Sequence, residues 1–224
     1  MEQLKELVKK LSALYGTSGD EEAVRNAIIE RLPSDVSYKV DNLGSLIVEK
    51  KGAAAPAKKL MMAAHMDEVG FIVTYINEDG TLAFAPVGGI LPGVVFGRQL
   101  VFKNGVHGAV AGKPLHMLKG DEEDNQPKLS DLCIDIGADK REEAEKLVSI
   151  GDCAYFTGEQ IDFGEGFMAG KALDDRVGCA VMLELLNKEL PYDCTFVFTV
   201  QEEIGTRGAA AAAYSVNPDI AVLL

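Results

Sequence analysis

The sequence predicts an α/β fold, a mixed sheet flanked by helices, into which a β-barrel-like domain is inserted. Apolar runs that are too short for a helix alternate with amphipathic helical patterns near both ends of the chain. The middle of the chain instead consists of short β segments separated by Gly-rich turns. With 224 residues, 47% of them hydrophobic, the chain is long enough to bury a substantial core.

Two amphipathic helices open the chain. Apolar residues recur at helical spacing over residues 4–14, and Gly16 follows as a stop signal. Residues 18–21 have the Ser-x-x-Glu form of a capping box, so we expect the second helix to begin there. Its apolar stripe covers residues 24–32 and ends before Pro33.

Three strands follow these helices. Residues 36–40 and 45–50 are expected to pair around the turn at 41–44. The run at 60–64 (LMMAA) is apolar on both faces, which is typical of a central strand. His65 comes directly after this run, so polar groups stand at the end of a buried strand.

The residues after Gly70 have the pattern of a separate β-rich domain. The expected strands are 71–76, 81–85, 100–102 and 106–111. One helix is expected near 140–148, and the alternation of strands and helices resumes only afterwards. We therefore predict an inserted β-rich domain at 72–164 within an α/β domain formed by 1–71 and 165–224.

The last part of the chain returns to the α/β pattern. We expect a helix over 177–185, a buried strand over 195–200 and a short Ala-rich helix over 209–213. Residues 220–224 have the character of a further buried strand. Because globular domains rarely end with an apolar strand, we expect the protein to continue beyond Leu224.

Composition excludes several classes of function. The formal net charge is −13, from 35 acidic and 22 basic residues, so most of the surface would repel nucleic acid. No apolar run approaches the roughly 18 residues needed to span a bilayer, and the charged opening segment is not a secretory signal. We expect a soluble cytoplasmic protein whose four cysteines are reduced thiols.

Three polar clusters are expected to meet at one edge of the predicted sheet. They are His65-Met66-Asp67, Asp174-Asp175 and Glu202-Glu203. Acids that lie close together raise each other's pKa values unless cations neutralise them. An imidazole with several carboxylates suits zinc, cobalt or manganese, and a pair of such ions can activate water while polarising a carbonyl.

Local spacing indicates how these residues could divide their roles. Asp67 lies two residues after His65 and could accept the second ring N–H of the imidazole. Neighbours on an extended strand end point to opposite sides, so one of Glu202 and Glu203 could bind metal while the other acts as a base. A carboxylate that bridges two ions fits one of the two aspartates at 174 and 175.

The clusters also lie in segments that resemble a known family. Residues 65–70 (HMDEVG), 170–176 (GKALDDR) and 201–209 (QEEIGTRGA) are similar to the three motifs of the tetrahedral (TET) aminopeptidases. These are two-metal exopeptidases that include glutamyl, lysyl and deblocking aminopeptidases, and some members carry the name cellulase or endoglucanase. The resemblance extends from the first helix to Leu224 and implies a zinc-exopeptidase-like α/β domain.

The resemblance implies a role for each site residue. His65 would bind one of two divalent metal ions, Asp174 would bridge both, and Glu203 would bind the other. Glu202 would be the general base that deprotonates the metal-bridging water, and Asp67 would support catalysis by orienting His65. The ions would be zinc, cobalt or manganese, and the Asp174-Asp175 peptide bond would be cis.

The resemblance also implies substrates and partners. The protein would hydrolyse the N-terminal residue from peptides. It would form a homo-oligomer, from a dimer to a dodecamer, through the inserted domain, with neither nucleic acid nor a membrane as partner.

The match to the family has one departure. The family supplies two further ligands, an Asp and a His, beyond the position that matches Leu224. His107 and His116 lie in contexts that match no ligand motif. Two alternatives therefore stay open: a deacylase or amidohydrolase of the same clan, and a non-catalytic assembly module. A metal-free glycosidase is disfavoured because acid pairs beside a histidine suit metal better.

Overall fold

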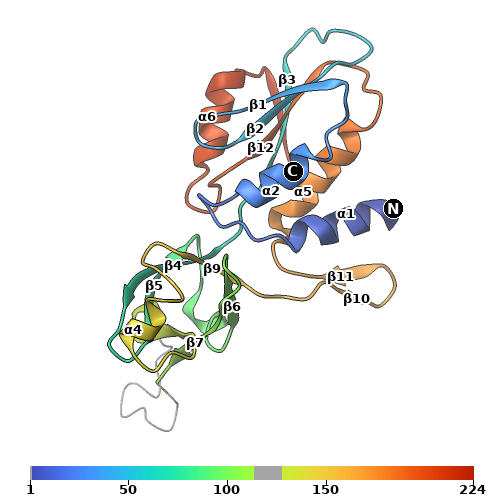
Figure 1. Ribbon diagram of the computed structural model, residues 1–224. Helices are drawn as coiled ribbons and strands as arrows, with labels where there is room; N and C mark the ends of the chain where they lie inside the picture. Colours follow the sequence, from blue (N-terminus) through green and yellow to red (C-terminus); the bar gives the residue numbers. More distant parts are fainter. Residues whose placement is uncertain (1, 114–127) are drawn as a thin grey trace. The chain divides into compact units, whose positions relative to one another are not determined.

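The computed structural model describes residues 2–113 and 128–224, which form two compact units (Figure 1). The first unit comprises Met1–Glu68 and Gly158–Leu224, and the second comprises Val69–Thr157. Both boundaries lie a few residues earlier than the predicted limits of the inserted domain at 72 and 164. His116 and the polar segment around it lie outside the described residues.

A five-stranded mixed sheet forms the centre of the first unit, in the order β1-β2-β12-β3-β13. Strands β12 and β13 run parallel to β3, whereas β2 is antiparallel to both β1 and β12. The strands are β1 (Val36–Val40), β2 (Leu46–Lys50), β3 (Leu60–His65), β12 (Cys194–Thr199) and β13 (Ile220–Leu223). The predicted mixed α/β sheet is thereby confirmed.

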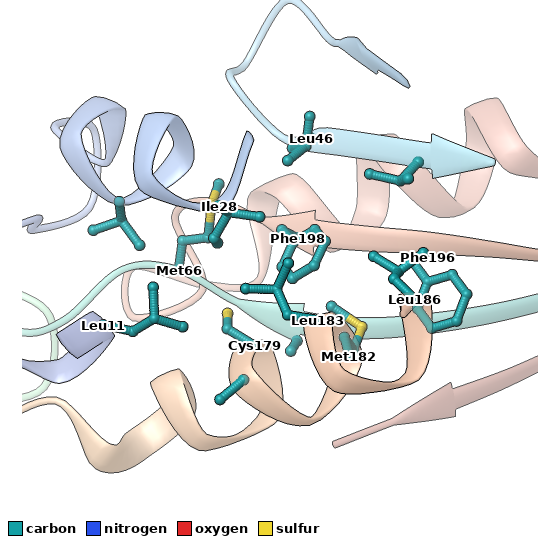
Figure 2. Packing of buried hydrophobic residues seen from close by; sticks show 14 of the residues in the cluster. Leu11, Ile28, Leu46, Met66, Cys179, Met182, Leu183, Leu186, Phe196 and Phe198 are labelled. Carbon is teal, nitrogen blue, oxygen red and sulfur yellow. The ribbon is translucent and has the colours of Figure 1, made fainter. Parts of the chain in front are cut away.

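Helices cover both faces of this sheet. The four helices are α1 (Glu2–Ser12), α2 (Glu22–Ile29), α5 (Leu173–Leu186) and α6 (Arg207–Val216). The larger core cluster joins α1, α2 and α5 to one face of β2, β3 and β12, and Figure 2 shows its buried side chains. A smaller cluster on the other face packs α6 against the same strands.

The alternation of side chains along β12 produces these two layers. Phe196 and Phe198 are buried in the larger cluster, while Val197 between them is buried in the cluster beneath α6. Leu46 and Ile47 divide between the two clusters in the same way on β2. A strand buried on both faces explains why these runs are almost continuously apolar.

The second unit is a closed six-stranded barrel in the order β4-β5-β8-β7-β6-β9. Its strands are β4 (Gly70–Ile76), β5 (Leu82–Val87), β6 (Gln99–Phe102), β7 (His107–Gly112), β8 (Leu132–Asp135) and β9 (Cys153–Phe156). Short helices connect them: η1 (Pro92–Val94), η3 (Leu129–Asp131) and α4 (Arg141–Ala144). The expected barrel-like domain is confirmed, although the sequence pattern did not predict strands β8 and β9.

A small hairpin follows the barrel along the chain and belongs to the first unit. It consists of β10 (Ile161–Phe163) and β11 (Phe167–Ala169). The carboxylate of Asp162 forms ion pairs with Lys5 at 2.8 Å and Lys9 at 2.7 Å, both on α1. These contacts explain why residues 158–164 group with the α/β unit.

Strand β13 differs from its expected burial. It pairs with β3 at the edge of the sheet, but all four of its residues are exposed, and Leu223 is 72% exposed. The expectation of a buried strand is wrong in this respect, because the sequence shows apolar character and not which element covers it. Among the described residues, no helix is both long and apolar enough to cross a membrane.

Candidate active site

The candidate site stands where two parallel strands end side by side. Thr199, the last residue of β12, pairs with His65, the last residue of β3. The segments that follow these strands therefore leave the sheet at the same edge, which is where open α/β sheets bind their ligands. The first turn of α5 brings Asp174 to this edge, within hydrogen-bond distance of His65.

Three predicted site residues converge into one group. His65, Glu202 and Glu203 each offer a ligand atom, and these atoms all lie within 4.8 Å of one another. The distance from His65 Nε2 to Glu202 Oε2 is 4.0 Å. Asp174 lies outside this mutual group but places Oδ1 2.9 Å from His65 Nε2. A nitrogen and several carboxylate oxygens at such distances form a donor set that fits a divalent cation.

Glu202 and Glu203 do not point to opposite sides, so that expectation is wrong. Strand β12 ends at Thr199, and Gln201 has a φ angle of 56°, so the two glutamates do not continue the extended strand. The turn that contains them brings a carboxylate oxygen of each toward His65. Their geometry therefore does not by itself distinguish a base from a ligand.

Asp67 joins the two strand ends. Its side chain is fully buried, Oδ1 accepts the N–H of Glu202 at 3.0 Å, and Oδ2 accepts the N–H of Glu203 at 3.1 Å. The hydroxyl of Ser18 also donates to Oδ2, at 2.5 Å. Burial on its own would raise the pKa of Asp67, but these hydrogen bonds and the nearby imidazole hold the pKa below its usual value.

His65 makes a hydrogen bond through each ring nitrogen. Nδ1 lies 3.1 Å from the carbonyl oxygen of Asp67 and 3.5 Å from its Oδ1, while Nε2 faces Asp174. Both partners offer oxygen atoms to the ring. Burial would lower the pKa of His65, but Asp67 and Asp174 outweigh it and raise the pKa to about 9.

The residues expected to cap the second helix serve the site instead. Helix α2 begins at Glu22, and no side chain caps its N-terminus. Ser18 binds Asp67, and Glu21 accepts the N–H of Gly19 at 2.8 Å and that of Gln201 at 3.0 Å. Sequence reasoning missed this role because the Ser-x-x-Glu spacing already had a local explanation.

The aspartate pair at the start of α5 divides between solvent and core. The Asp174-Asp175 peptide bond is cis, as expected, and neither residue has helical backbone angles. The side chain of Asp174 is 89% exposed, whereas Asp175 is buried and accepts the N–H of Gly178 at 2.9 Å. Burial raises the pKa of Asp175. The exposed Asp174 is therefore the member of the pair that is available to a ligand.

A buried charge network supports the segment that carries the site. Lys171 Nζ lies 2.7 Å from Glu68 Oε1, and Arg176 lies 3.8 Å from the same oxygen. Arg176 is fully buried and donates to the carbonyl oxygens of Met66 and Leu11. Lys171 therefore pairs with Glu68 and not with a residue of the candidate metal group.

The chain is similar to known aminopeptidases. A family model described as M42 glutamyl aminopeptidase matches residues 44–224. A putative aminopeptidase of Acetivibrio thermocellus is 46% identical over 224 residues, which cover 99% of this chain and 65% of that protein. The chain thus spans about two thirds of the length of this relative.

Solved structures show the same similarity. Aminopeptidase APDkam598 from Desulfurococcus kamchatkensis matches with a TM-score of 0.90 at 36% identity, over 99% of this chain and 62% of that one. The TET1 peptidase of Pyrococcus horikoshii matches with a TM-score of 0.88 at 35% identity, over 99% of this chain and 68% of that one.

Arg176→Met should destabilise the protein strongly. The substitution removes a buried cation beside Glu68 and leaves several buried carbonyl oxygens without a donor, which costs roughly 3–5 kcal/mol. Urea unfolding of the purified protein measures the change in the free energy of unfolding. Arg31→Met is the matched control, because Arg31 is exposed. Equal stabilities of the two variants would contradict a supporting role for the network.

Proposed function

Since the chain belongs to the M42 glutamyl aminopeptidase family, we propose that the protein is a metal-dependent aminopeptidase that hydrolyses the N-terminal residue from peptides. The observation that carries this proposal is the convergence of His65, Glu202 and Glu203 within 4.8 Å, with Asp174 beside His65. The family match confirms the resemblance seen in the three sequence motifs. The names of the relatives agree with this activity.

In this proposal His65, Asp174 and Glu203 would hold two divalent metal ions, and Asp174 would be the ligand shared by both. The ions are zinc, cobalt or manganese, which accept imidazole together with carboxylates. The 2.9 Å separation of His65 Nε2 and Asp174 Oδ1 supports the assignment, because these two atoms are close enough that both could be ligands of one ion. The acidic surroundings favour cation binding because a divalent ion would neutralise more of the carboxylate charge than a proton does.

The polypeptide supplies the proton transfers. When bound, the metal pair lowers the pKa of a water molecule and polarises the carbonyl of the first peptide bond. Glu202 removes the proton from the attacking water and later donates it to the leaving amine. Its side chain is 38% exposed, so it can reach both water and substrate.

Asp67 supports this chemistry without contacting the substrate. Nδ1–H of His65 donates to the carbonyl oxygen of Asp67, which leaves Nε2 as the metal-binding nitrogen. The carboxylate of Asp67 holds the backbone of Glu202 and Glu203. Asp67 thus orients the proposed metal ligand His65 and also positions the backbone of the proposed base, Glu202.

We further propose that the two units have separate tasks. The α/β unit, predicted as 1–71 and 165–224, is the catalytic domain, and the β-barrel unit, predicted as 72–164, is the dimerisation domain. The protein then forms a homo-oligomer, from a dimer to a dodecamer. The Pyrococcus horikoshii TET1 peptidase, which can assemble into a tetrahedron or a large octahedral shell, supports this proposal.

Glu202→Gln should reduce turnover by about 10²–10⁴-fold, because the amide cannot accept the proton of the attacking water. Hydrolysis of aminoacyl-amide substrates measures the rate, and elemental analysis measures the bound metal, which should be unchanged. Glu189→Gln is the control, since Glu189 is exposed and lies after the end of α5. Substantial activity in the Glu202 variant with normal metal content would refute its role as the base.

Removal of metal by a chelator should abolish aminopeptidase activity while leaving the fold intact. The core clusters of both units consist of hydrophobic side chains and the buried network pairs Lys171 with Glu68, so circular dichroism should be unchanged. Zinc, cobalt and manganese are then added back separately, and at least one should restore activity. Full activity in the metal-free protein would rule out the proposed mechanism.

The metal-loaded protein should be larger than one chain in light scattering. We expect a mass between that of a dimer and that of a dodecamer, because association through the proposed dimerisation domain does not require bound substrate. Measurement over a range of protein concentrations distinguishes a stable particle from weak association. A monomer at all concentrations would contradict the oligomeric proposal.

A further inference from the structure

We infer that Ser18 and Glu21, on the turn between α1 and α2, are positioning residues for the candidate site. The inference rests on the proposed function, since it assigns these two residues to the support of Glu202 and Glu203. Neither residue lies in the three sequence motifs, and neither is near the glutamates along the chain. The hydrogen bonds of the turn connect them.

Three successive backbone N–H groups carry the argument. They belong to Gln201, Glu202 and Glu203, which follow the end of β12 and so have no partner within the sheet. Glu21 accepts the first at 3.0 Å, and Asp67 accepts the second and third at 3.0 and 3.1 Å. Two buried carboxylates thus hold the backbone from which both site glutamates project.

Glu21 binds a residue whose backbone conformation is constrained. Gln201 has a φ of 56°, a left-handed conformation that non-glycine residues rarely adopt. This conformation turns the chain out of β12 and directs the next two side chains toward His65. The hydrogen bond from Gln201 to Glu21, whose side chain is only 3% exposed, stabilises that turn.

Ser18 acts through Asp67. Its hydroxyl donates to Oδ2, the same oxygen that accepts the N–H of Glu203. This bond fixes the rotation of the Asp67 carboxylate, so that each oxygen faces one of the two backbone N–H groups. The adjoining backbone is held as well, since the N–H of Glu68 donates to the carbonyl oxygen of Gly16 at 2.9 Å.

A purely local role does not account for these contacts. Glu21 precedes α2, but its side chain forms no cap hydrogen bond to that helix. Its carboxylate instead reaches a loop far along the chain. Ser18 likewise bonds to a residue on another element. The turn therefore supports the candidate site and not the start of its own helix.

The test compares removal of each acceptor or donor with its conservative replacement. In Glu21→Ala and Ser18→Ala, kcat and metal affinity should fall by about 10–100-fold, as for other residues that orient metal ligands, with little change in KM. Glu21→Gln keeps an oxygen acceptor and Ser18→Thr keeps a hydroxyl, so both should retain activity within a few-fold of the wild type. Glu22→Ala, beside Glu21 but exposed, is the matched control.

Two results would overturn the inference. One is a Glu21→Ala variant with the kcat and zinc affinity of Glu22→Ala, even if its melting temperature falls, because that pattern describes a structural role only. The other is a folded Glu21→Gln variant as impaired as Glu21→Ala, because the retained acceptor would then not matter. If Glu21→Ala fails to fold, the Ser18→Ala and Ser18→Thr pair gives the decision.

Failure of the proposed function has a different signature. In that case the wild-type protein itself shows no metal-dependent aminopeptidase activity, and all variants match it. An active wild-type protein with fully active Ser18 and Glu21 variants defeats the positioning inference alone.

Discussion

One buried carboxylate, that of Asp67, is the contact on which the candidate site depends. Two parallel strands end side by side, and each leaves backbone groups that the sheet no longer pairs. Asp67 comes from the end of one strand and accepts the N–H groups of Glu202 and Glu203 beyond the end of the other. An unpaired buried N–H group costs about 1–3 kcal/mol, so the pairing stabilises one loop conformation over its alternatives. The side chains that meet His65 are directed by that conformation.

The next residue along the chain extends this support to the helices. The carboxylate of Glu68 pairs with Lys171 and lies near Arg176, whereas the carboxylate of Asp67 binds the loop after β12. Buried ion pairs contribute little net stability, because desolvation of the charges offsets their attraction. Their geometric effect is larger, since Arg176 also binds carbonyl oxygens of α1 and of Met66. The segment that carries the site is thus held from both sides.

Sequence patterns predicted the layers of the fold and the three polar clusters, because both follow from properties that are local in the chain. A short run that is apolar on both faces favours a covered strand, and polar groups after such a strand are expected at a sheet edge. The predictions that were wrong concern which other parts of the chain surround a strand or a turn. Strand β13 has the same composition as a buried strand but lies exposed at an edge. Ser18 and Glu21 fit a capping box, and only the folded chain shows that their partners are Asp67 and Gln201.

The arrangement of the glutamates shows why the support is needed. Glu202 and Glu203 converge on one imidazole, and carboxylates at such separations repel each other. The hydrogen bonds from the backbone to Asp67 and Glu21 hold the loop against this repulsion. These hydrogen bonds organise the site before any cation binds. Cation binding then relieves the electrostatic repulsion that remains between the carboxylates. The same hydrogen bonds that shape the loop therefore favour metal binding at its centre.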